Sequence, residues 1–184
     1  MVMIRILFFS ILFIVCSNCD AQKIIVKFER PSFAQVDSII TAQKCEVRQF
    51  DYQITVSKDY FPGADTLKLG KPIVFSKNLD SLSFEQSIFF SLPDSLIRLS
   101  DYTWNANQRT LKQLKQQFEI NKKFVSEYFG KAGISVVKQP GPGDENYFSE
   151  SVTWQDEYAY VNVYFIAGMD TYRTRVIVSW RKRI

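Results

Sequence analysis

Hydrophobic and polar residues alternate most clearly in the last third of the chain, and this period of two is typical of half-buried strands. Four strands are predicted there, at residues 134–138, 147–154, 158–166 and 172–181. The connections at 155–157 and 167–171 are too short for a parallel crossover, which needs about a dozen residues or more. The sequence therefore predicts an antiparallel four-strand meander.

Ahead of this meander the apolar residues change to the period of a helix. They fall three or four positions apart along one stripe, with lysine and glutamine residues off it: Leu111, Leu114, Phe118, Val125 and Tyr128. Gly130 follows, and glycine commonly ends a helix in the left-handed conformation. The pattern predicts a long amphipathic helix over 107–129 that covers one face of the sheet.

The N-terminal half has weaker patterns and no detectable internal repeat. Ser32 and Gln35 have the spacing of a capping box, which predicts a short helix over 33–43. Strict alternation predicts a strand over 50–56, followed by a turn at Pro62. Further elements are expected from apolar and β-branched runs: strands over 23–29, 66–69, 72–76 and 84–92, and one helical turn within 94–100.

Together these elements predict an α+β fold. An antiparallel β-sheet, made of the C-terminal meander plus N-terminal strands, packs on the helix over 107–129. Two arrangements of the N-terminal strands remain open, because they either extend that sheet or form a second one nearby.

The start of the chain is an apolar run, 6–15, which follows Arg5 and leads to small residues ending at Ala21. Ten helical residues span about 15 Å, roughly half the hydrocarbon thickness of a bilayer. The pattern predicts a cleaved signal peptide at 1–21 and a single domain at 22–184, without a transmembrane segment after cleavage. We expect an exported protein, periplasmic or extracellular, and in general appearance the chain resembles small secreted or periplasmic proteins of Gram-negative bacteria.

The alternative fate of this leader is lipidation. A bacterial lipoprotein needs a small residue directly before the acylated cysteine, whereas Cys19 follows Asn18 and Cys16 follows Val15. Acylation at Cys19 would make the protein a membrane-anchored lipoprotein through acyl chains alone.

Composition narrows the chemistry. The chain has no histidine, the commonest general base and metal ligand. After cleavage Cys45 would be the one remaining cysteine, expected as a small buried hydrophobe, so a disulfide framework and a zinc-binding cysteine cluster are excluded within one chain. Loss of Arg5 and Asp20 leaves the net charge at +4, which is too small and dispersed to indicate nucleic-acid binding. We expect no cofactor and no metal.

The best candidate surface lies on the last predicted hairpin. Alternation places Ala159, Val161, Val163 and Phe165 toward the core, so the tyrosines and arginines of the hairpin point outward. The candidate binding residues are Tyr160, Tyr164, Arg173, Arg175 and Arg181. Stacking and positive charge on such a surface fit an envelope protein or an anionic glycan. An ordinary solvated sheet face has the same pattern, and charge reversal at Arg173 and Arg175 is expected to leave folding intact.

Catalytic patterns are weaker. Ser135 and Lys138 have S-x-x-K spacing, but in a strand they point to opposite faces. Three carboxylates, Glu150, Asp156 and Glu157, would support a hydrolase without histidine if two of them faced each other across a cleft.

The tryptophans offer little more. Trp180 has core parity, while Trp104 and Trp154 remain open as a sugar platform. By elimination the sequence predicts a non-catalytic binding or interaction module of the cell envelope. The alternatives are the carboxylate hydrolase and an assembly subunit or inhibitor that docks by a strand edge.

Overall fold

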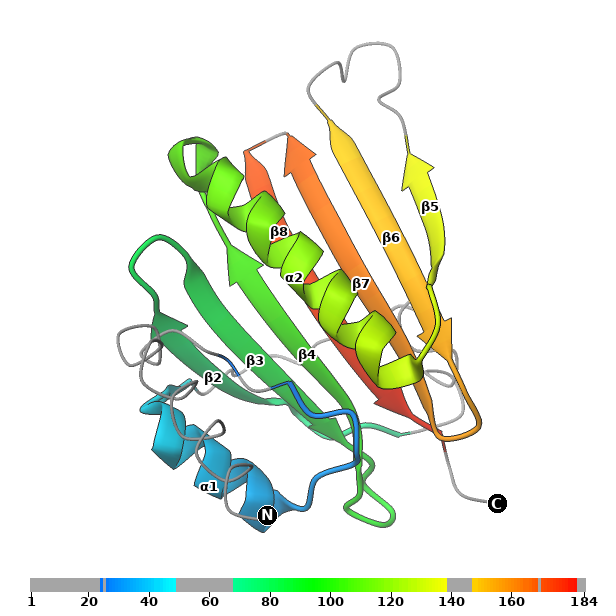
Figure 1. The fold of residues 1–184 in the computed structure, drawn as a ribbon. Helices are drawn as coiled ribbons and strands as arrows, with labels where there is room; N and C mark the ends of the chain where they lie inside the picture. Colours follow the sequence, from blue (N-terminus) through cyan, green and yellow to red (C-terminus); the bar gives the residue numbers. More distant parts are fainter. Residues whose placement is uncertain (1–23, 25, 49–67, 139–146, 169, 182–184) are drawn as a thin grey trace, which may run out of the picture.

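The computed structural model describes residues 24, 26–48, 68–138, 147–168 and 170–181. Within these residues one antiparallel sheet of eight strands has the order β1-β2-β3-β4-β8-β7-β6-β5. Two helices lie on the same side of it (Figure 1), which we name the helical face. The other side is the reverse face. The predicted α+β fold, an antiparallel sheet packed with a helix, is confirmed.

The elements follow the chain as α1 (Phe33–Gln43), β1 (Glu46–Arg48), β2 (Ile73–Asn78), β3 (Ser83–Phe90), β4 (Ile97–Asn105), the 3-10 helix η3 (Gln108–Thr110), α2 (Leu111–Phe129), β5 (Ile134–Lys138), β6 (Phe148–Gln155), β7 (Ala159–Gly168) and β8 (Thr171–Trp180). The predicted C-terminal strands and their antiparallel pairing are confirmed within a few residues. Prediction also located β2 and β3. Of the strand expected at 66–69, residues 68 and 69 are described, and Leu69 forms a single bridge to Ser91.

The two halves of the described chain have the same order of elements. α1 precedes β1 to β4, and α2 precedes β5 to β8. The halves meet where their last strands, β4 and β8, pair with each other (Figure 1). The N-terminal strands therefore extend the sheet of the meander rather than forming a second one.

α2 packs across β6, β7 and β8. Leu114, Phe118 and Val125 are buried as predicted, and the Phe118 ring lies 5.3 Å from that of Phe165 on β7. Tyr128 departs from the prediction because half of it is exposed, and its ring lies instead beside Phe28, 4.4 Å away. Gly130 ends the helix in the left-handed conformation with φ 62°.

α1 confirms its predicted start. The Ser32 hydroxyl accepts a hydrogen bond from the Gln35 N–H at 3.3 Å, and the Gln35 side chain accepts one from the Ser32 N–H at 2.8 Å. These bonds satisfy two donors that a helix N-terminus otherwise leaves unpaired. Val36 and Ile40 are buried in the core, so α1 covers the N-terminal half of the helical face.

The N-terminal strap, residues 24 and 26–30, corrects the strand expected over 23–29. Val26 and Phe28 are buried, but the strap makes no strand pairing. Its main chain bonds to side chains instead, because the Trp180 indole N–H donates to the Phe28 carbonyl at 2.6 Å and the Lys27 N–H donates to the Tyr102 hydroxyl at 3.1 Å. The β-branched residues of this segment therefore indicate burial in the core and not hydrogen bonding to a neighbouring strand.

The helical turn expected within 94–100 is wrong, because β4 begins at Ile97 and becomes a central strand. The polar residues of β4 made this strand unrecognisable from the sequence pattern. Arg98 is buried and bonds to Ser91 and Asp94, which lie in the turn between β3 and β4. Ser100 accepts a hydrogen bond from Gln86 at 3.0 Å. Buried polar groups are tolerated where they find such partners, and here the partners come from β3 and from the turn between β3 and β4.

Several predictions fall outside the described residues: the leader at 1–21, the lipidation alternatives Cys16 and Cys19, the strand at 50–56 and the turn at Pro62. Among the residues that are described, no helix combines the length and hydrophobicity needed to cross a bilayer.

Candidate binding surfaces

The last hairpin has the predicted two faces. Ala159, Val161, Val163 and Phe165 are all buried toward the helices. On the reverse face Tyr164 lies directly opposite Arg175, while Arg173 lies opposite Ile166 and Tyr160 opposite Ser179. The predicted pairing of tyrosine with arginine across the hairpin thus occurs once, at Tyr164 and Arg175.

Arg175 joins the two halves of the sheet. Its guanidinium makes a two-pronged contact with the Asp101 carboxylate of β4, with Nε donating to Oδ1 at 3.1 Å and Nη2 donating to Oδ2. The two side chains are 24% and 11% exposed. The Thr103 hydroxyl also donates to Asp101, at 3.1 Å. Such an ion pair is costly to break because either partner alone would be a poorly solvated charge, so Arg175 has a structural role.

The residues at the centre of the reverse face are buried as well. Asn162 is 2% exposed, and its amide donates to the Ser151 hydroxyl at 2.7 Å and to the Thr153 hydroxyl at 3.2 Å. Ile177, next to it on β8, is also buried. The face is therefore not the solvated sheet surface that alternation alone suggests.

Arg181 lies apart from the other candidate residues. It follows β8, about 26 Å along the strand direction from Arg173 at the usual rise per residue. Its guanidinium donates to the Gln155 side chain at 2.9 Å, and its carbonyl accepts a hydrogen bond from Arg30 at 2.6 Å. The five candidate residues thus do not converge on one patch.

The carboxylates have structural partners. Asp156 accepts hydrogen bonds from the N–H groups of Tyr158 and Ala159 at 2.7 and 2.8 Å, which shapes the β6–β7 turn. Glu150 lies six residues earlier on β6, about 20 Å away along an extended strand. That distance is about twice the span over which paired carboxyl groups act on one glycosidic bond.

Glu150 belongs instead to a cluster with Lys122 and Ser135. Its Oε1 accepts hydrogen bonds from Lys122 Nζ and from the Ser135 hydroxyl, each at 3.3 Å. Burial opposes the charge on Lys122, but hydrogen bonds to Glu119 and Glu150 outweigh it and raise the pKa of the ammonium above its ordinary value. Lys122 is therefore held protonated, which is the wrong state for a base that would activate Ser135.

The S-x-x-K residues separate as expected for a strand. Ser135 lies opposite Val152 and points to the helical face, while Lys138 lies opposite Ser149 and points to the reverse face. Two residues on opposite faces of a sheet do not form a serine–lysine pair.

The tryptophans form no platform, because Trp104, Trp154 and Trp180 are all buried. Cys45 is partly buried beside the core, and burial raises the pKa of its thiol. The described residues contain no group of three or more cysteine or carboxylate side chains placed to hold a metal ion.

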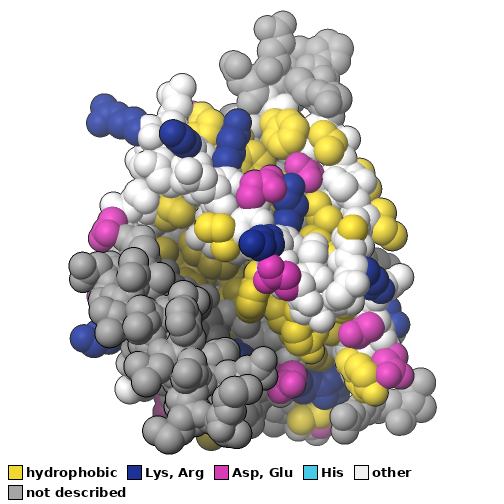
Figure 2. Space-filling view, viewed as in Figure 1, with side chains coloured by type: hydrophobic (Ala, Val, Ile, Leu, Met, Phe, Trp, Pro, Cys, Tyr) yellow, Lys and Arg dark blue, Asp and Glu magenta, His cyan; other side chains and the backbone are white. Residues whose placement is uncertain are grey.

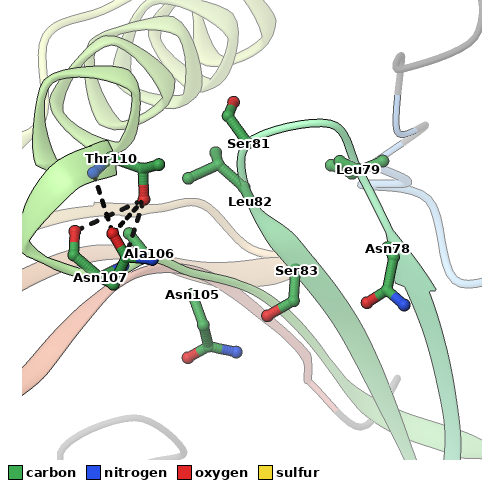
Figure 3. Close-up of a pocket in the computed structure, with 9 residues that line it drawn as sticks. All are labelled: Asn78, Leu79, Ser81, Leu82, Ser83, Asn105, Ala106, Asn107 and Thr110. Carbon is green, nitrogen blue, oxygen red and sulfur yellow. Dashed lines mark hydrogen bonds between the residues drawn. The ribbon is translucent and has the colours of Figure 1, made fainter.

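A pocket of about 370 Å³ opens at the end of the sheet near the start of α2. Asn78, Ser83 and Asn105 extend into this region from neighbouring strands, while Asn107 and Thr110 bond to each other (Figure 3). Its nine described lining residues are amide, hydroxyl and aliphatic side chains. The pocket offers hydrogen bonds but neither charge nor ring stacking, so it does not identify a ligand.

The outer edge of β5 is the most open feature. All five residues of β5 are exposed, and Ile134, Val136 and Val137 are 72%, 55% and 46% exposed. β5 pairs with β6 on one side, and no described strand pairs with its other side. Figure 2 shows hydrophobic side chains among charged ones on the side of the molecule where β5 lies. An apolar edge strand with unpaired main-chain groups is a template for another chain.

β5 is held in place at its start. The link from α2 contains Gly133, where a Cβ atom would lie 2.5 Å from Trp154 Cε2 and 2.6 Å from Val152 Cγ1. The Trp154 indole N–H donates to the Lys131 carbonyl at 3.2 Å. Only glycine allows the backbone to pass this close to Trp154, so the edge is a positioned surface rather than a loose end.

The opposite edge of the sheet differs. β1 has three residues, and two of them, Glu46 and Arg48, are charged. Short, charged edge strands resist pairing with other chains.

The chain matches no known protein family, no curated protein and no solved structure.

Proposed function

We propose that this protein is an exported, non-catalytic assembly module of the bacterial cell envelope that joins another protein chain by strand addition at β5. The observation that carries the proposal is the exposed β5 edge, with three large apolar side chains on five residues. In strand addition the main chain supplies affinity and alternate side chains supply specificity. β5 offers both, because apolar side chains project on each face of the sheet.

The hairpin face supports this choice by contrast. Arg175 is engaged with Asp101, and Arg181 with Gln155. Their donors would have to leave existing partners before binding an anionic glycan, whereas the outer main-chain groups of β5 have no partner among the described strands. The contact surface proposed here is therefore the strand edge rather than the Tyr–Arg surface.

The polar clusters also favour binding over hydrolysis. Glu150 lies far along β6 from Asp156, and Lys122 is held in its charged form. Neither arrangement provides the paired acid and base that hydrolysis requires.

Export is supported by the apolar run at 6–15 and the small residues up to Ala21. Val26 and Phe28 enter the core soon after that position, so cleavage after Ala21 leaves the described core in the mature chain. Intact-mass analysis of the protein from the native host tests this step. A chain that begins at Gln22 is expected, while an acylated chain that begins at Cys19 would make the protein a lipoprotein.

The edge is tested by placing a photo-crosslinking amino acid at position 136 in the full chain, expressed in the native host. The matched control carries it at Val47, which is 61% exposed on the other edge strand. Irradiation should give a covalent protein adduct at 136 and much less at 47. Equal labelling at both positions, or none at 136, contradicts the proposal.

A further inference from the structure

We infer that the chain added at β5 is a second copy of this protein, paired antiparallel with its own β5 about Val136. This inference rests on the proposed function of the β5 edge. It would join two sheets edge to edge around a twofold axis, the commonest symmetry among protein dimers.

Symmetry limits how two copies of β5 can pair. A half-turn about the sheet normal reverses the strand direction and keeps each side chain on its own face. Residues that pair must then come from the same face, so the axis passes through residue 135, 136 or 137. An axis through Val136 alone pairs all five residues of both strands, while the other two leave overhanging ends.

The side chains fit this register. Ile134 and Val136 share the reverse face, because they lie opposite Thr153 and Ser151 of β6. Val136 would meet Val136 of the second copy, with the two Ile134 side chains on either side of this contact. β-branched pairs across neighbouring strands are favourable.

Charge is compatible with self-pairing. Lys138 is the one charged residue of β5, and in this register it lies opposite Ile134 of the second copy. No like charges face each other across the strands, and the aliphatic part of the lysine can cover the isoleucine. On the helical face Ser135 lies opposite Val137 of the second copy, and the bond of Ser135 to Glu150 holds it close to its own sheet.

The interface is small. A contact along five-residue strands buries less than the roughly 1,200 Å² of stable complexes, so the dimer should be weak and dependent on concentration. Association should therefore be measured by covalent trapping as well as by sedimentation.

The test uses single cysteines in the chain that begins at Gln22, with Cys45→Ser, oxidised under mild conditions. In the inferred register Val136→Cys faces itself, with Cα atoms about 4.5–5.5 Å apart, inside the range for a disulfide. Ile134→Cys is the matched control, since it is on the same strand and face and is more exposed. Two copies of Ile134→Cys would lie about 13 Å apart, because four residues separate them along the strand.

We expect disulfide-linked dimer from Val136→Cys to exceed that from Ile134→Cys by about tenfold or more, because bridging needs Cα atoms within about 7 Å. A mixture of Ile134→Cys with Lys138→Cys chains should also cross-link, since these positions face each other. Circular dichroism of each reduced variant checks that the fold is retained. Similar yields at 134 and 136, or no dimer at 136 at high protein concentration, would overturn the inference.

The photo-crosslinking adduct separates the two claims. An adduct at position 136 with twice the mass of the chain supports both of them. An adduct that contains a different protein supports the strand-edge function and overturns self-pairing. Absence of any adduct at 136 overturns the function itself.

Discussion

The two halves of the sheet share one order of elements yet end in opposite kinds of edge. The N-terminal half ends in β1, which is three residues long and carries Glu46 and Arg48. The C-terminal half ends in β5, which exposes Ile134, Val136 and Val137. Because the order of the strands is the same, the difference comes from the length and the side chains of the two edge strands. One edge is protected against pairing, and the other is suited to it.

The halves also differ in how they place polar residues. β7 buries one polar residue, Asn162, whereas β4 buries three: Arg98, Ser100 and Asp101. Each of these three is bonded to another side chain. β4 therefore depends on specific polar partners to a greater extent than β7 does.

The largest effect on stability is expected from Gly133→Ala, which would disturb the close approach of the backbone that positions β5. The new methyl group would collide with Trp154 and Val152, both buried. Overpacking of this kind costs about 1–3 kcal/mol of unfolding free energy. Thermal unfolding measures it, with Gly130→Ala as control, where the left-handed φ is strained but nothing lies within 4 Å. A smaller loss for Gly133→Ala than for Gly130→Ala would contradict the tight approach.

The ion pair between Asp101 of β4 and Arg175 of β8, which links the two halves of the sheet, is tested with Asp101→Ala and Arg175→Ala. Removing one partner of a buried pair costs about 3–5 kcal/mol, and partial exposure should lower this to about 2 kcal/mol here. The double variant should lose less than the sum of both single losses, measured by urea unfolding. This expectation replaces the view that charge reversal at Arg175 leaves folding intact. Additive losses would show that the two side chains do not interact.

Ser32→Ala tests whether the capping box stabilises the helix of the N-terminal half. Loss of the hydroxyl that accepts from the Gln35 N–H should cost about 1 kcal/mol. Thr110 is the matched control in the other half, because it precedes α2 without a side-chain bond to that helix. Its own bonds are to Asn107, so Thr110→Ser keeps the hydroxyl and should change stability little. Equal losses in both variants would argue against the capping role of Ser32.

Asp94 makes the turn between β3 and β4 sensitive to acid. A hydrogen bond from the Ser91 hydroxyl, together with bonds from Leu96 and Arg98, lowers the pKa of its carboxyl. A carboxyl with a lowered pKa in the folded state stabilises the fold above its unfolded pKa, about 3.9, and this contribution disappears as the pH falls through the folded-state pKa. Asp94→Asn should therefore lower the unfolding temperature near neutral pH, and the gap to the wild type should narrow as the pH falls below the unfolded pKa of about 3.9. A gap that stays constant with pH would exclude the ionised carboxylate as the cause.

The smallest effect on stability is expected from Val136→Lys, at most about 0.5 kcal/mol, because the side chain is at an exposed edge. Its effect on association should be large, since two lysines would face each other across the twofold axis. Mixing Val136→Lys with Val136→Asp chains should restore pairing, measured by analytical sedimentation. Val47→Lys on β1 should leave association unchanged, and dissociation by this control would place the contact elsewhere.

The predicted meander, α1 and α2 were readable because their apolar residues recur with a regular period. β4 was not, because its polar residues resemble those of a turn until Asp94, Gln86 and Arg175 are brought beside them. The strap was misread for the opposite reason, since Val26 and its neighbours are apolar but bond to side chains instead of to a strand. The Tyr–Arg candidates were placed on the right face, yet their partners Asp101 and Gln155 could not be foreseen from local pattern.

The sequence by itself determined which residues form most elements and which side of each strand turns inward, because periodicity is a local property of the chain. It also determined the absence of histidine and the presence of an apolar run at 6–15. Tertiary structure alone decided that the two halves join through β4 and β8 and that β5 lies at an edge of the sheet. It also decided that Arg175 forms an ion pair with Asp101. These outcomes depend on contacts between residues far apart in the chain, and no local pattern carries that information.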